Sequence, residues 1–341
     1  MRVAVLSGGR SSEHDVSVVS GRSVIEALDP ERYDVREIEI ARDGRWELGA
    51  GSRGELAAGD GALSEPGLPI PAGERAPEPL TDVDVVFPVL HGPFGEDGTV
   101  QGLLELAGVA YVGAGVTASA LCMDKDLFKA VMRDKGIPVT RSIPVLKRHA
   151  ERVENPFGYP VVVKPARLGS SVGISMVREP GELEAAVALA FQHDEKILLE
   201  EFVSGVEVEC GVLGNEEPIA SLVGEIVPLS SDWYDYSAKY DDGGMDLVVP
   251  ARISDEATRR VQDLAVASFV AADCEGMARV DFFVREDGSV LVNELNTIPG
   301  FTATSVYAKL FEASGIPYAE LLDRLVALAV DRQDRRADLR F

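Results

Sequence analysis

Two acidic side chains within MARVDFFVREDGSVLVNELNTIPG, residues 277–300, have the spacing of a metal site. Two apolar runs flank Asp287-Gly288, a dipeptide typical of a two-residue turn, and so predict a β-hairpin. If the strands pair so that Glu286 lies opposite Ser289, every second residue shares one face. That face then carries two opposite pairs of polar residues, Asp281 with Glu294 and Arg279 with Asn296.

The two facing acids require a positive partner. Like charges directly opposite each other destabilise a sheet, and the apolar neighbours add a desolvation cost. Two carboxylates and an amide oxygen are hard ligands that suit Mg²⁺ held jointly with substrate phosphates. We therefore expect Asp281, Glu294 and Asn296 to bind a divalent metal. Two alternatives remain: a surface hairpin with solvated acids, and a register shifted by one residue, which would separate the pair.

The segment VVVKPARLGSSVGIS, residues 161–175, suggests a phosphate site. A buried-strand pattern ends at Lys164, and the loop that follows is rich in glycine and serine. An ammonium at a strand end can bind phosphate, and the N–H groups of such a loop can fold around it as a concave nest. The alternative is a lysine that keeps a strand end soluble. Neither the Walker A pattern nor GxGxxG is present, which argues against a P-loop or a dinucleotide site.

Composition limits the class of protein. The 341 residues carry a net charge of −24, so free nucleic acid and anionic membrane surfaces are unexpected partners. The three cysteines are far apart and include no CxxC, which favours buried thiols over a disulfide or zinc site. The N-terminal apolar run is too short for a signal peptide, and no apolar segment has membrane-spanning length. These features predict a cytoplasmic protein.

The remaining elements predict an α/β protein of three domains, with an α+β C-terminal part. Strand, helix and strand alternate within residues 1–115, which is typical of a parallel sheet. Residues 49–82, rich in Gly, Ala, Pro and acids, are expected to form a surface insertion. Residues 116–203 hold a second α/β region, and residues 204–341 a third, with the tyrosine-rich loop 230–245. The buried face of the first helix is expected to carry Val16, Val19, Ser20, Val24, Ala27 and Leu28.

Together these parts resemble the ATP-grasp superfamily and, within it, the D-alanine–D-alanine ligase family. The resemblance covers nearly the whole chain except residues 49–82. The segments that carry it are GGRSSEHDVSVVSG, HGPFGEDGTVQGLLELAGVAYVG, MDK, VVVKPARLGSSVGIS, EEFVSGVEVE, YDYSAKY, RVDFF and NELNTIPGFTATS. It implies a three-domain ATP-grasp architecture: an N-terminal domain (1–115), a central subdomain (116–203) and a C-terminal subdomain (204–341) with a lid loop of omega type and the magnesium site.

The resemblance also implies an activity. Such ligases phosphorylate the carboxylate of a first D-alanine with ATP, and the amine of a second D-alanine attacks the acyl phosphate. Mg²⁺ or Mn²⁺, two ions, a homodimer and a place in peptidoglycan precursor synthesis are implied with it. Ligases that use D-lactate or D-serine share the fold and are the first alternative. A noncatalytic nucleotide-binding protein and a dinucleotide-dependent oxidoreductase are further alternatives, which the retained magnesium ligands and the missing fingerprint disfavour.

For ATP, the resemblance assigns two lysines, a loop and a hinge. Lys125 and Lys164 match the α- and β-phosphate ligands, and Ser170 and Ser171 lie in the loop that covers the phosphates. The hinge and its neighbours would hold the nucleoside: Glu200 on the adenine amino group, Glu201 and Val203 on adenine through their backbone, and Glu207 on the ribose. Glu200 and Glu201 could instead be a solvated pair at a strand end.

For the amino acids, the resemblance assigns a second group of residues. Arg279 and the Gly300 N–H match the oxyanion ligands, although Arg279 could also form a structural salt bridge with Asp281 or Glu294. Glu13 would bind the first D-alanine's ammonium, with an N-terminal helix cap as the alternative. The remaining implied roles are Ser170 and Tyr240 in a triad with Glu13, Lys239 on the transferred phosphate, His91 near the substrates, and Ser305 with the Val306 N–H on the second substrate's carboxylate.

Overall fold

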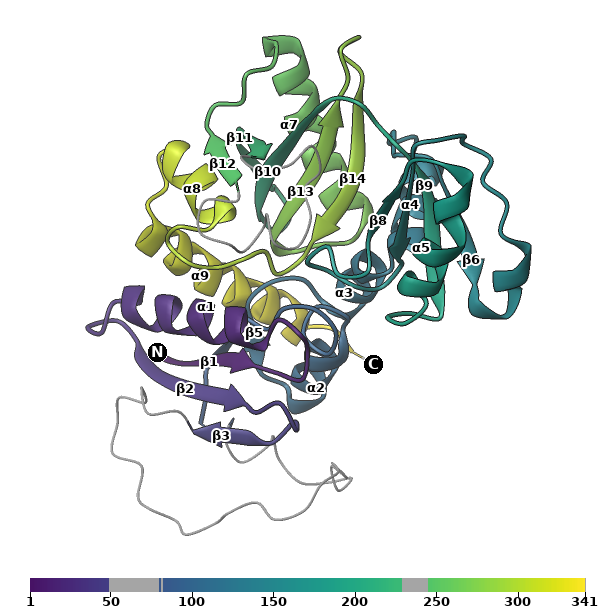
Figure 1. The fold of residues 1–341 in the computed structure, drawn as a ribbon. Helices are drawn as coiled ribbons and strands as arrows, with labels where there is room; N and C mark the ends of the chain where they lie inside the picture. Colours follow the sequence, from purple (N-terminus) through teal and green to yellow (C-terminus); the bar gives the residue numbers. More distant parts are fainter. Residues whose placement is uncertain (49–79, 81, 229–244, 341) are drawn as a thin grey trace.

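The computed structural model describes residues 1–48, 80, 82–228 and 245–340. Three β-sheets organise these residues, and helices pack against each sheet (Figure 1). The N-terminal sheet lies at one end of the molecule, and the central and C-terminal sheets lie next to each other at the other end. Parallel pairing in the first sheet and antiparallel pairing in the other two confirm the predicted α/β class with an α+β C-terminal part.

The N-terminal sheet has the strand order β3-β2-β1-β4-β5, and its neighbours are parallel except β2 with β3. Its elements are β1 (Arg2–Gly8), α1 (His14–Ala27), β2 (Asp34–Ile40), β3 (Trp46–Leu48), β4 (Val85–Pro88), α2 (Thr99–Ala107) and β5 (Ala110–Tyr111). The loop after β1 carries Glu13 at the carboxyl end of the sheet. In parallel sheets this is the edge at which ligands bind.

Helix α1 packs closely on this sheet through small residues. A Cβ added at Gly21 would lie 2.6 Å from the Ser7 Cβ, so only glycine allows this approach. Val19 was expected on the buried face, but its side chain is 57% exposed. That prediction was wrong because the buried face of α1 is centred near Ser17, Gly21 and Val24, and Val19 lies on the opposite side of the helix. The buried residues are His14, Ser17, Ser20, Gly21, Val24 and Ile25.

The central sheet has the order β6-β9-β7-β8, with antiparallel neighbours. Its strands and covering helices are β6 (Ser142–Leu146), η2 (Lys147–Arg152), β7 (Val161–Pro165), β8 (Ser175–Val177), η3 (Pro180–Glu182), α5 (Leu183–Ala190) and β9 (Lys196–Glu201). Helices α3 (Val116–Met123) and α4 (Lys125–Asp134) come before this sheet in the chain. Phe128 and Met132 of α4 are buried in the core of the C-terminal sheet, so α4 links the two sheets.

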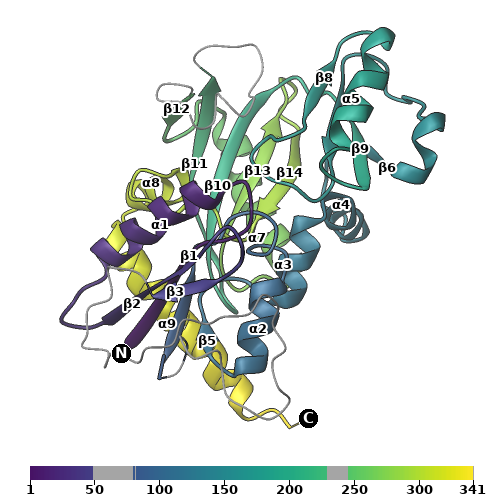
Figure 2. The ribbon, with the colours of Figure 1, turned by 60° about the horizontal axis from the view of Figure 1, so that its bottom comes forward.

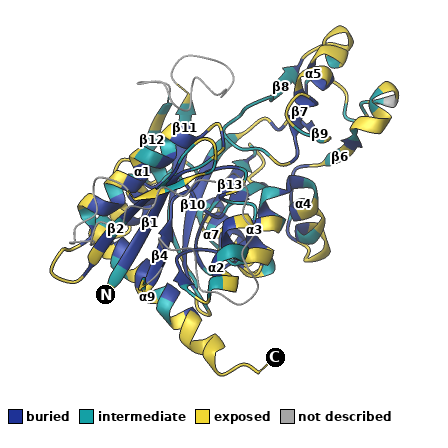
Figure 3. Cartoon of the chain, turned by 90° about the horizontal axis from the view of Figure 1, so that it is seen from below, coloured by how far each residue is buried: buried dark blue, intermediate teal, exposed yellow. Residues whose placement is uncertain are grey.

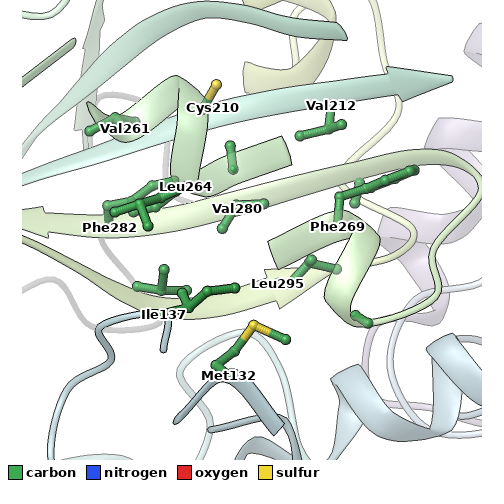
Figure 4. Packing of buried hydrophobic residues seen from close by; sticks show 14 of the residues in the cluster. Met132, Ile137, Cys210, Val212, Val261, Leu264, Phe269, Val280, Phe282 and Leu295 are labelled. Atoms are coloured by element: carbon green, nitrogen blue, oxygen red, sulfur yellow. The ribbon is translucent and has the colours of Figure 1, made fainter. Parts of the chain in front are cut away.

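The C-terminal sheet has the order β12-β11-β10-β13-β14 and is antiparallel. Its elements are β10 (Val206–Gly214), β11 (Ile219–Pro228), β12 (Met245–Val248), α7 (Asp255–Ala271), β13 (Gly276–Val284) and β14 (Val290–Asn296). Helix α7 covers one face, where Leu264 and Phe269 pack against Val280 and Phe282 (Figure 4). The helices that follow β14 in the chain and the candidate site lie on the opposite face of this sheet.

Two C-terminal helices connect this sheet to the N-terminal one: α8 (Val306–Ala313) and α9 (Tyr318–Ala337). Helix α9 lies against the N-terminal sheet and shares its core through Leu321, Leu325 and Ala329 (Figure 2). The strands are mostly buried and the last turns of α9 are exposed (Figure 3). Among the described residues, no helix combines the length and apolar character needed to cross a membrane.

Two smaller predictions can be compared with the structure. Cys122, Cys210 and Cys274 are buried free thiols, as expected. Most of the predicted insertion 49–82 lies outside the described residues. Leu80, near its end, is only 1% exposed and packs in the core of the N-terminal sheet, whereas the last residue, Asp82, is exposed.

Candidate active site

The facing acids are where the hairpin predicted them. Asp281 pairs with Glu294, and Arg279 pairs with Asn296, across β13 and β14. Asp281 is 3% exposed, so the alternative of a surface hairpin with solvated acids is wrong. The alternative of a register shifted by one residue is also wrong at this end of the hairpin.

The turn differs from the prediction by one residue. Arg285 N–H donates to Ser289 O (2.9 Å), which closes a three-residue loop with Gly288 at φ 81°, a region that favours glycine. The two-residue Asp287-Gly288 turn is therefore wrong. A β-bulge between Asp281 and Phe282 places Phe282 opposite Val292 and leaves Asn293 as the extra residue. The bulge restores the predicted pairing at the acids.

Arg279 provides the positive charge beside Asp281. Its Nε and Nη2 each lie 2.7 Å from an Asp281 oxygen, and its Nε lies 3.0 Å from Glu209 Oε2. Burial would lower the pKa of Arg279, but Asp281 and Glu209 outweigh it and raise that pKa further. The predicted salt bridge therefore forms, and it leaves Arg279 on the same face as the acids. The sequence does not single out Glu209, although its spacing of two residues from Glu207 places both on one face of β10.

Lys125 neutralises the second acid. Its Nζ lies 3.2 Å from Glu294 Oε2 and 2.9 Å from Leu168 O. Burial alone would lower the pKa of Lys125, yet the charge and hydrogen bond of Glu294 raise it. Lysine and arginine thus supply at the acids the positive charge that a metal would supply.

The donor set fits a metal that is shared with a substrate. Within the described part of the chain, no group of three His, Cys, Asp or Glu side chains could hold a metal by itself. Asp281 and Glu294 offer carboxylate oxygens, and the Asn296 amide, whose Nδ2 lies 3.1 Å from Asp281 Oδ2, would turn its oxygen toward a cation. Two carboxylates and one amide suit Mg²⁺, which keeps other positions for phosphate oxygens and water.

A pocket of about 420 Å³ lies between the central and C-terminal sheets, beside these acids. Its walls combine charged ends with an apolar interior. The residues predicted for ATP and metal that line it are Lys125, Lys164, Ser170, Ser171, Glu200, Glu201, Val203, Glu207 and Glu294. The apolar part includes Val162, Ile174, Ile226 and Phe283. A flat aromatic base fits between such side chains, with phosphates toward the lysines.

The structure buries both hinge acids and pairs each with cations. Glu201 is 9% exposed, and its carboxylate accepts from Arg141 Nε (2.8 Å). Glu200 is 3% exposed and binds Lys164 Nζ (2.8 Å) and Lys129. The alternative of a solvated acid pair is therefore wrong. Despite burial, which raises it, the pKa of Glu200 falls to about 2 because two lysines adjoin it.

Lys129 was not predicted as part of the site. Its side chain is fully buried, and its Nζ donates to Glu200 and to Thr140 Oγ1. Burial lowers the pKa of Lys129 to about 8, although Glu200 opposes that shift. The sequence signal was its position four residues after Lys125 on one helix, which places both lysines on one face.

Glu13 meets the Gly/Ser loop, as the resemblance implied. Ser170 Oγ donates to Glu13 Oε1. Glu13 is also the N-cap residue of α1, as the alternative expected, but its carboxylate accepts no capping hydrogen bond from that helix. Ser170 and Ser171 have φ values of 54° and 56°, a left-handed backbone that non-glycine residues seldom adopt. Such backbone strain is found where a loop must aim its groups at a ligand. Tyr240, the third member of the predicted triad, lies outside the described residues, as do Lys239 and most of loop 230–245.

His91 and Glu96 hold the loop after β4. His91 is buried, and its ring nitrogens contact Ile298 O (3.1 Å) and Ser20 Oγ (3.3 Å). Burial lowers the pKa of His91, so its ring is neutral near pH 7. Glu96 accepts from Gly92 N–H (2.7 Å) and Ile298 N–H (3.3 Å). Burial and the charge of Glu13 raise the pKa of Glu96 to about 8.

The sequence did not assign Glu96, although it lies in the segment HGPFGEDG. An acid between glycines directly before a helix was the available signal. Because Glu96 joins the loop after β4 to the loop after β14, it fixes the position of the Gly300 segment relative to the N-terminal sheet.

The start of α8 forms the remaining part of the site. Ser305 precedes the first helical residue, Val306, and its Oγ accepts from Thr302 N–H (3.0 Å). A Cβ added at Gly300 would lie 3.4 Å from Ser305 Oγ, so the two predicted residues are neighbours. The first N–H groups of a helix lack intrahelical partners and attract anions. This corner therefore suits a substrate carboxylate.

Comparison with known proteins agrees with this geometry. Sequence profiles described as D-ala D-ala ligase N-terminus and C-terminus match residues 2–114 and 131–327. A D-alanine–D-alanine ligase from Geobacillus thermodenitrificans is 44% identical, covering 98% of this chain and 97% of its own. A second, from a Thermoanaerobacter species, is 45% identical, covering 98% of each chain.

Two solved structures superimpose over nearly the whole chain. The D-alanine–D-alanine ligase from Coxiella burnetii has a TM-score of 0.81 and 36% identity, covering 99% of this chain and 96% of its own. A D-Ala:D-Ser ligase from Enterococcus faecalis has a TM-score of 0.80 and 36% identity, covering 96% of this chain and 99% of its own. The fold is the predicted ATP-grasp fold, and the chain belongs to the D-alanine–D-alanine ligase family.

Proposed function

We propose that this protein joins two D-alanine molecules to D-alanyl-D-alanine, with conversion of ATP to ADP and phosphate. The proposal rests on one observation: three parts of the candidate site lie next to one another. The lysine-lined pocket, the Asp281–Glu294 face and the Glu13–Ser170 contact come from all three sheets or the loops that leave them. Family membership supports the use of ATP with a divalent metal.

ATP binds in the pocket between the central and C-terminal sheets. Adenine lies between the apolar walls, with the Glu200 carboxylate on its amino group and the backbone of Glu201 and Val203 on its ring edge. Glu207 binds the ribose hydroxyls. Lys125 and Lys164 bind the phosphates, and the loop with Ser170 and Ser171 folds over them.

Asp281, Glu294 and Asn296 hold the divalent metal, Mg²⁺ or Mn²⁺, and we propose two ions. A metal held by these residues would supply positive charge to offset the negative charge that moves with the phosphoryl group. Lys125, which pairs with Glu294 in the described structure, then turns to phosphate, and Lys239 contacts the transferred group. The protein side chains thereby exchange one ionic partner for another without leaving a buried charge unpaired.

The amino acids bind on the N-terminal side of this face. Glu13 holds the ammonium of the first D-alanine, whose carboxylate oxygen takes the γ-phosphoryl group and releases ADP. His91 keeps the loop beside this substrate in place. The carboxylate of the second D-alanine lies at Ser305 and the Val306 N–H. These contacts bring its nitrogen to the acyl phosphate.

Peptide formation then needs a proton acceptor and an oxyanion site. The second substrate's ammonium loses a proton through Ser170 or Tyr240, and its lone pair attacks the acyl carbon. Arg279 and the Gly300 N–H stabilise the tetrahedral oxyanion, which collapses to the amide as phosphate leaves. Loop 230–245 closes over the site and excludes water from the acyl phosphate.

The larger setting is also proposed. The three sheets support a division into domains at residues 1–115, 116–203 and 204–341. We propose a homodimer in the cytoplasm, where D-alanyl-D-alanine would supply peptidoglycan synthesis. Size-exclusion chromatography with light scattering tests the dimer, and a monomeric mass at working concentrations would contradict it.

The function is tested by ATP- and Mg²⁺-dependent phosphate release with D-alanine alone, and with D-alanine plus D-lactate or D-serine, with product masses measured. We expect phosphate release with D-alanine alone and the mass of the dipeptide. Turnover that requires D-lactate or D-serine would assign a variant ligase of the same fold. An absence of turnover with all three would contradict the proposal.

A further inference from the structure

Lys129 is a buried charge for which the proposed reaction has no use. It lies on α4, its side chain is 0% exposed, and it does not line the nucleotide pocket. A buried ammonium is costly unless it is paired and hydrogen-bonded. Both of its partners, Glu200 and Thr140, are buried as well. Such a charge needs a reason beyond packing, because a methionine would fill the same space at lower desolvation cost.

The position of Glu200 between two lysines suggests that reason. Its Oε2 binds Lys129, and its Oε1 binds Lys164 Nζ at 2.8 Å. Only one of the two lysines can meet a ligand, because Lys164 and Glu200 line the pocket and Lys129 lies behind them. Lys164 has a second contact, 3.3 Å from Oδ1 of the bulge residue Asn293.

Phosphate binding disturbs this cluster. When a phosphate oxygen takes Lys164, Glu200 loses one of its two counter-ions and lies near a polyanion. With Lys129 present, Glu200 stays neutralised, and the charge of Lys164 is available to the phosphate. Without Lys129, Glu200 and the phosphate would compete for the single charge of Lys164.

We propose that Lys129 is a positioning residue for ATP, which holds Glu200 as a permanent counter-ion so that Lys164 can exchange Glu200 for a phosphate oxygen. This inference rests on the proposed function for the identity of the ligand. It concerns nucleotide binding alone and involves no step of peptide formation. On this proposal, Lys129 also holds Glu200 in place when Lys164 turns to the phosphate.

The test is a double-mutant cycle on the full-length protein, with the dissociation constant of ATP measured by calorimetry in Mg²⁺ and without D-alanine. The variants are Lys129→Met, Glu200→Gln and the double variant. We expect Lys129→Met to weaken ATP binding on the order of tenfold or more, since a buried carboxylate loses its counter-ion. In the Glu200→Gln background, Lys129→Met should change the dissociation constant of ATP by less than about twofold.

Steady-state kinetics provide a second readout. Lys129→Met should raise KM for ATP far more than it lowers kcat at saturating ATP, because Lys129 does not contact the reacting atoms. Lys135→Met is the matched control, since Lys135 follows the same helix, is exposed and, among the described residues, has an ion pair only with its neighbour Asp134. It removes the same formal charge and should leave KM for ATP and kcat unchanged.

An equal loss of ATP affinity from Lys129→Met in both Glu200 backgrounds would overturn the inference, as would unchanged affinity in the single variant. If the Lys129→Met variant does not fold, the ATP dissociation constants of the Glu200→Gln variant and the double variant are compared instead. The double variant removes Lys129 together with its carboxylate partner, and Lys164 has lost Glu200 in both proteins, so a tenfold difference between them would overturn the inference. Wild-type protein that binds ATP but does not join D-alanine would contradict the proposed function and leave this test intact.

Discussion

At the scale of single residues, the site is a set of charges that change partners. Asp281 holds Arg279, Glu294 holds Lys125, and Glu200 holds Lys164. Each pair joins a residue predicted for metal or nucleotide binding to a cation predicted for phosphate or oxyanion. Bound ATP and metal would replace these pairings one for one, which keeps buried charges compensated before and after binding.

Asp281→Asn and Glu294→Gln should each lower kcat on the order of 10³-fold, because each removes a charge worth several kcal/mol in phosphoryl transfer. Phosphate release at saturating ATP and D-alanine measures this loss, and circular dichroism checks the fold. Glu286→Gln, at the exposed turn of the same hairpin, is the control and should retain full activity. Near-normal turnover in either of the first two variants would refute the metal assignment.

Glu96 should make stability depend on pH. Its pKa is raised from 4.5 to about 8 by burial and by Glu13. The folded state therefore keeps a proton that the unfolded state releases above about pH 4.5, and stability falls as pH rises through this window. The free energy of unfolding of the wild type, relative to Glu96→Gln, should decrease from about pH 5 to about pH 8. Urea titrations at three pH values measure it, and a constant difference would contradict the assignment.

At the scale of elements, glycines and a bulge determine where side chains point. The bulge at Asn293 compensates for a turn that is one residue longer than predicted, and so keeps Asp281 opposite Glu294. Gly21 lets α1 lie close to β1, which positions Glu13 at the start of that helix.

Gly21→Ala should destabilise the protein by about 1–3 kcal/mol, because the new methyl group would overlap Ser7. It should also raise KM for D-alanine, since any shift of α1 moves Glu13 away from Ser170. Gly102→Ala on α2 is the matched control: a Cβ there meets nothing within 4 Å. That substitution should be neutral or stabilise by up to about 1 kcal/mol. Equal urea midpoints for the two variants would contradict the packing argument.

At the scale of the whole molecule, α9 connects the C-terminal subdomain to the N-terminal sheet. Arg332 is a buried residue of this helix and donates to Gly113 O and to Tyr111 O (2.7 Å), with its guanidinium 4.1 Å from the Tyr111 ring centre. These contacts keep the Glu13 side of the site in register with the Arg279 side, although the two lie far apart in the sequence.

Arg332→Met should cost about 1–3 kcal/mol, because two buried carbonyl groups lose a charged donor. Arg324→Met on the same helix is the control. Its partner is the exposed Glu320, and such surface pairs contribute at most about 1 kcal/mol. Thermal unfolding of both variants measures the difference, and a similar loss in the two would show that the connection does not depend on Arg332.

Much of the site follows from local patterns. Strand periodicity and a turn dipeptide predicted the pairing of Asp281 with Glu294. The pairing holds because the bulge at Asn293 offsets the longer turn. The lysine at the end of β7 and its loop were likewise visible, since buried strands and Gly/Ser loops have distinct compositions. The family resemblance extended these local predictions to Glu13, Arg279 and the hinge.

Tertiary structure decided the rest, for the physical reason that partners distant in sequence leave no local pattern. Lys129 and Glu200 are 71 residues apart, and their contact in the fold shows how Lys129 belongs to the site. Glu96 obtains its raised pKa from burial among loops that meet only in the fold and from the charge of Glu13. Val19 is exposed because α1 turns the face with Ser17, Gly21 and Val24 toward its sheet, and residue type and helical period alone did not identify that face.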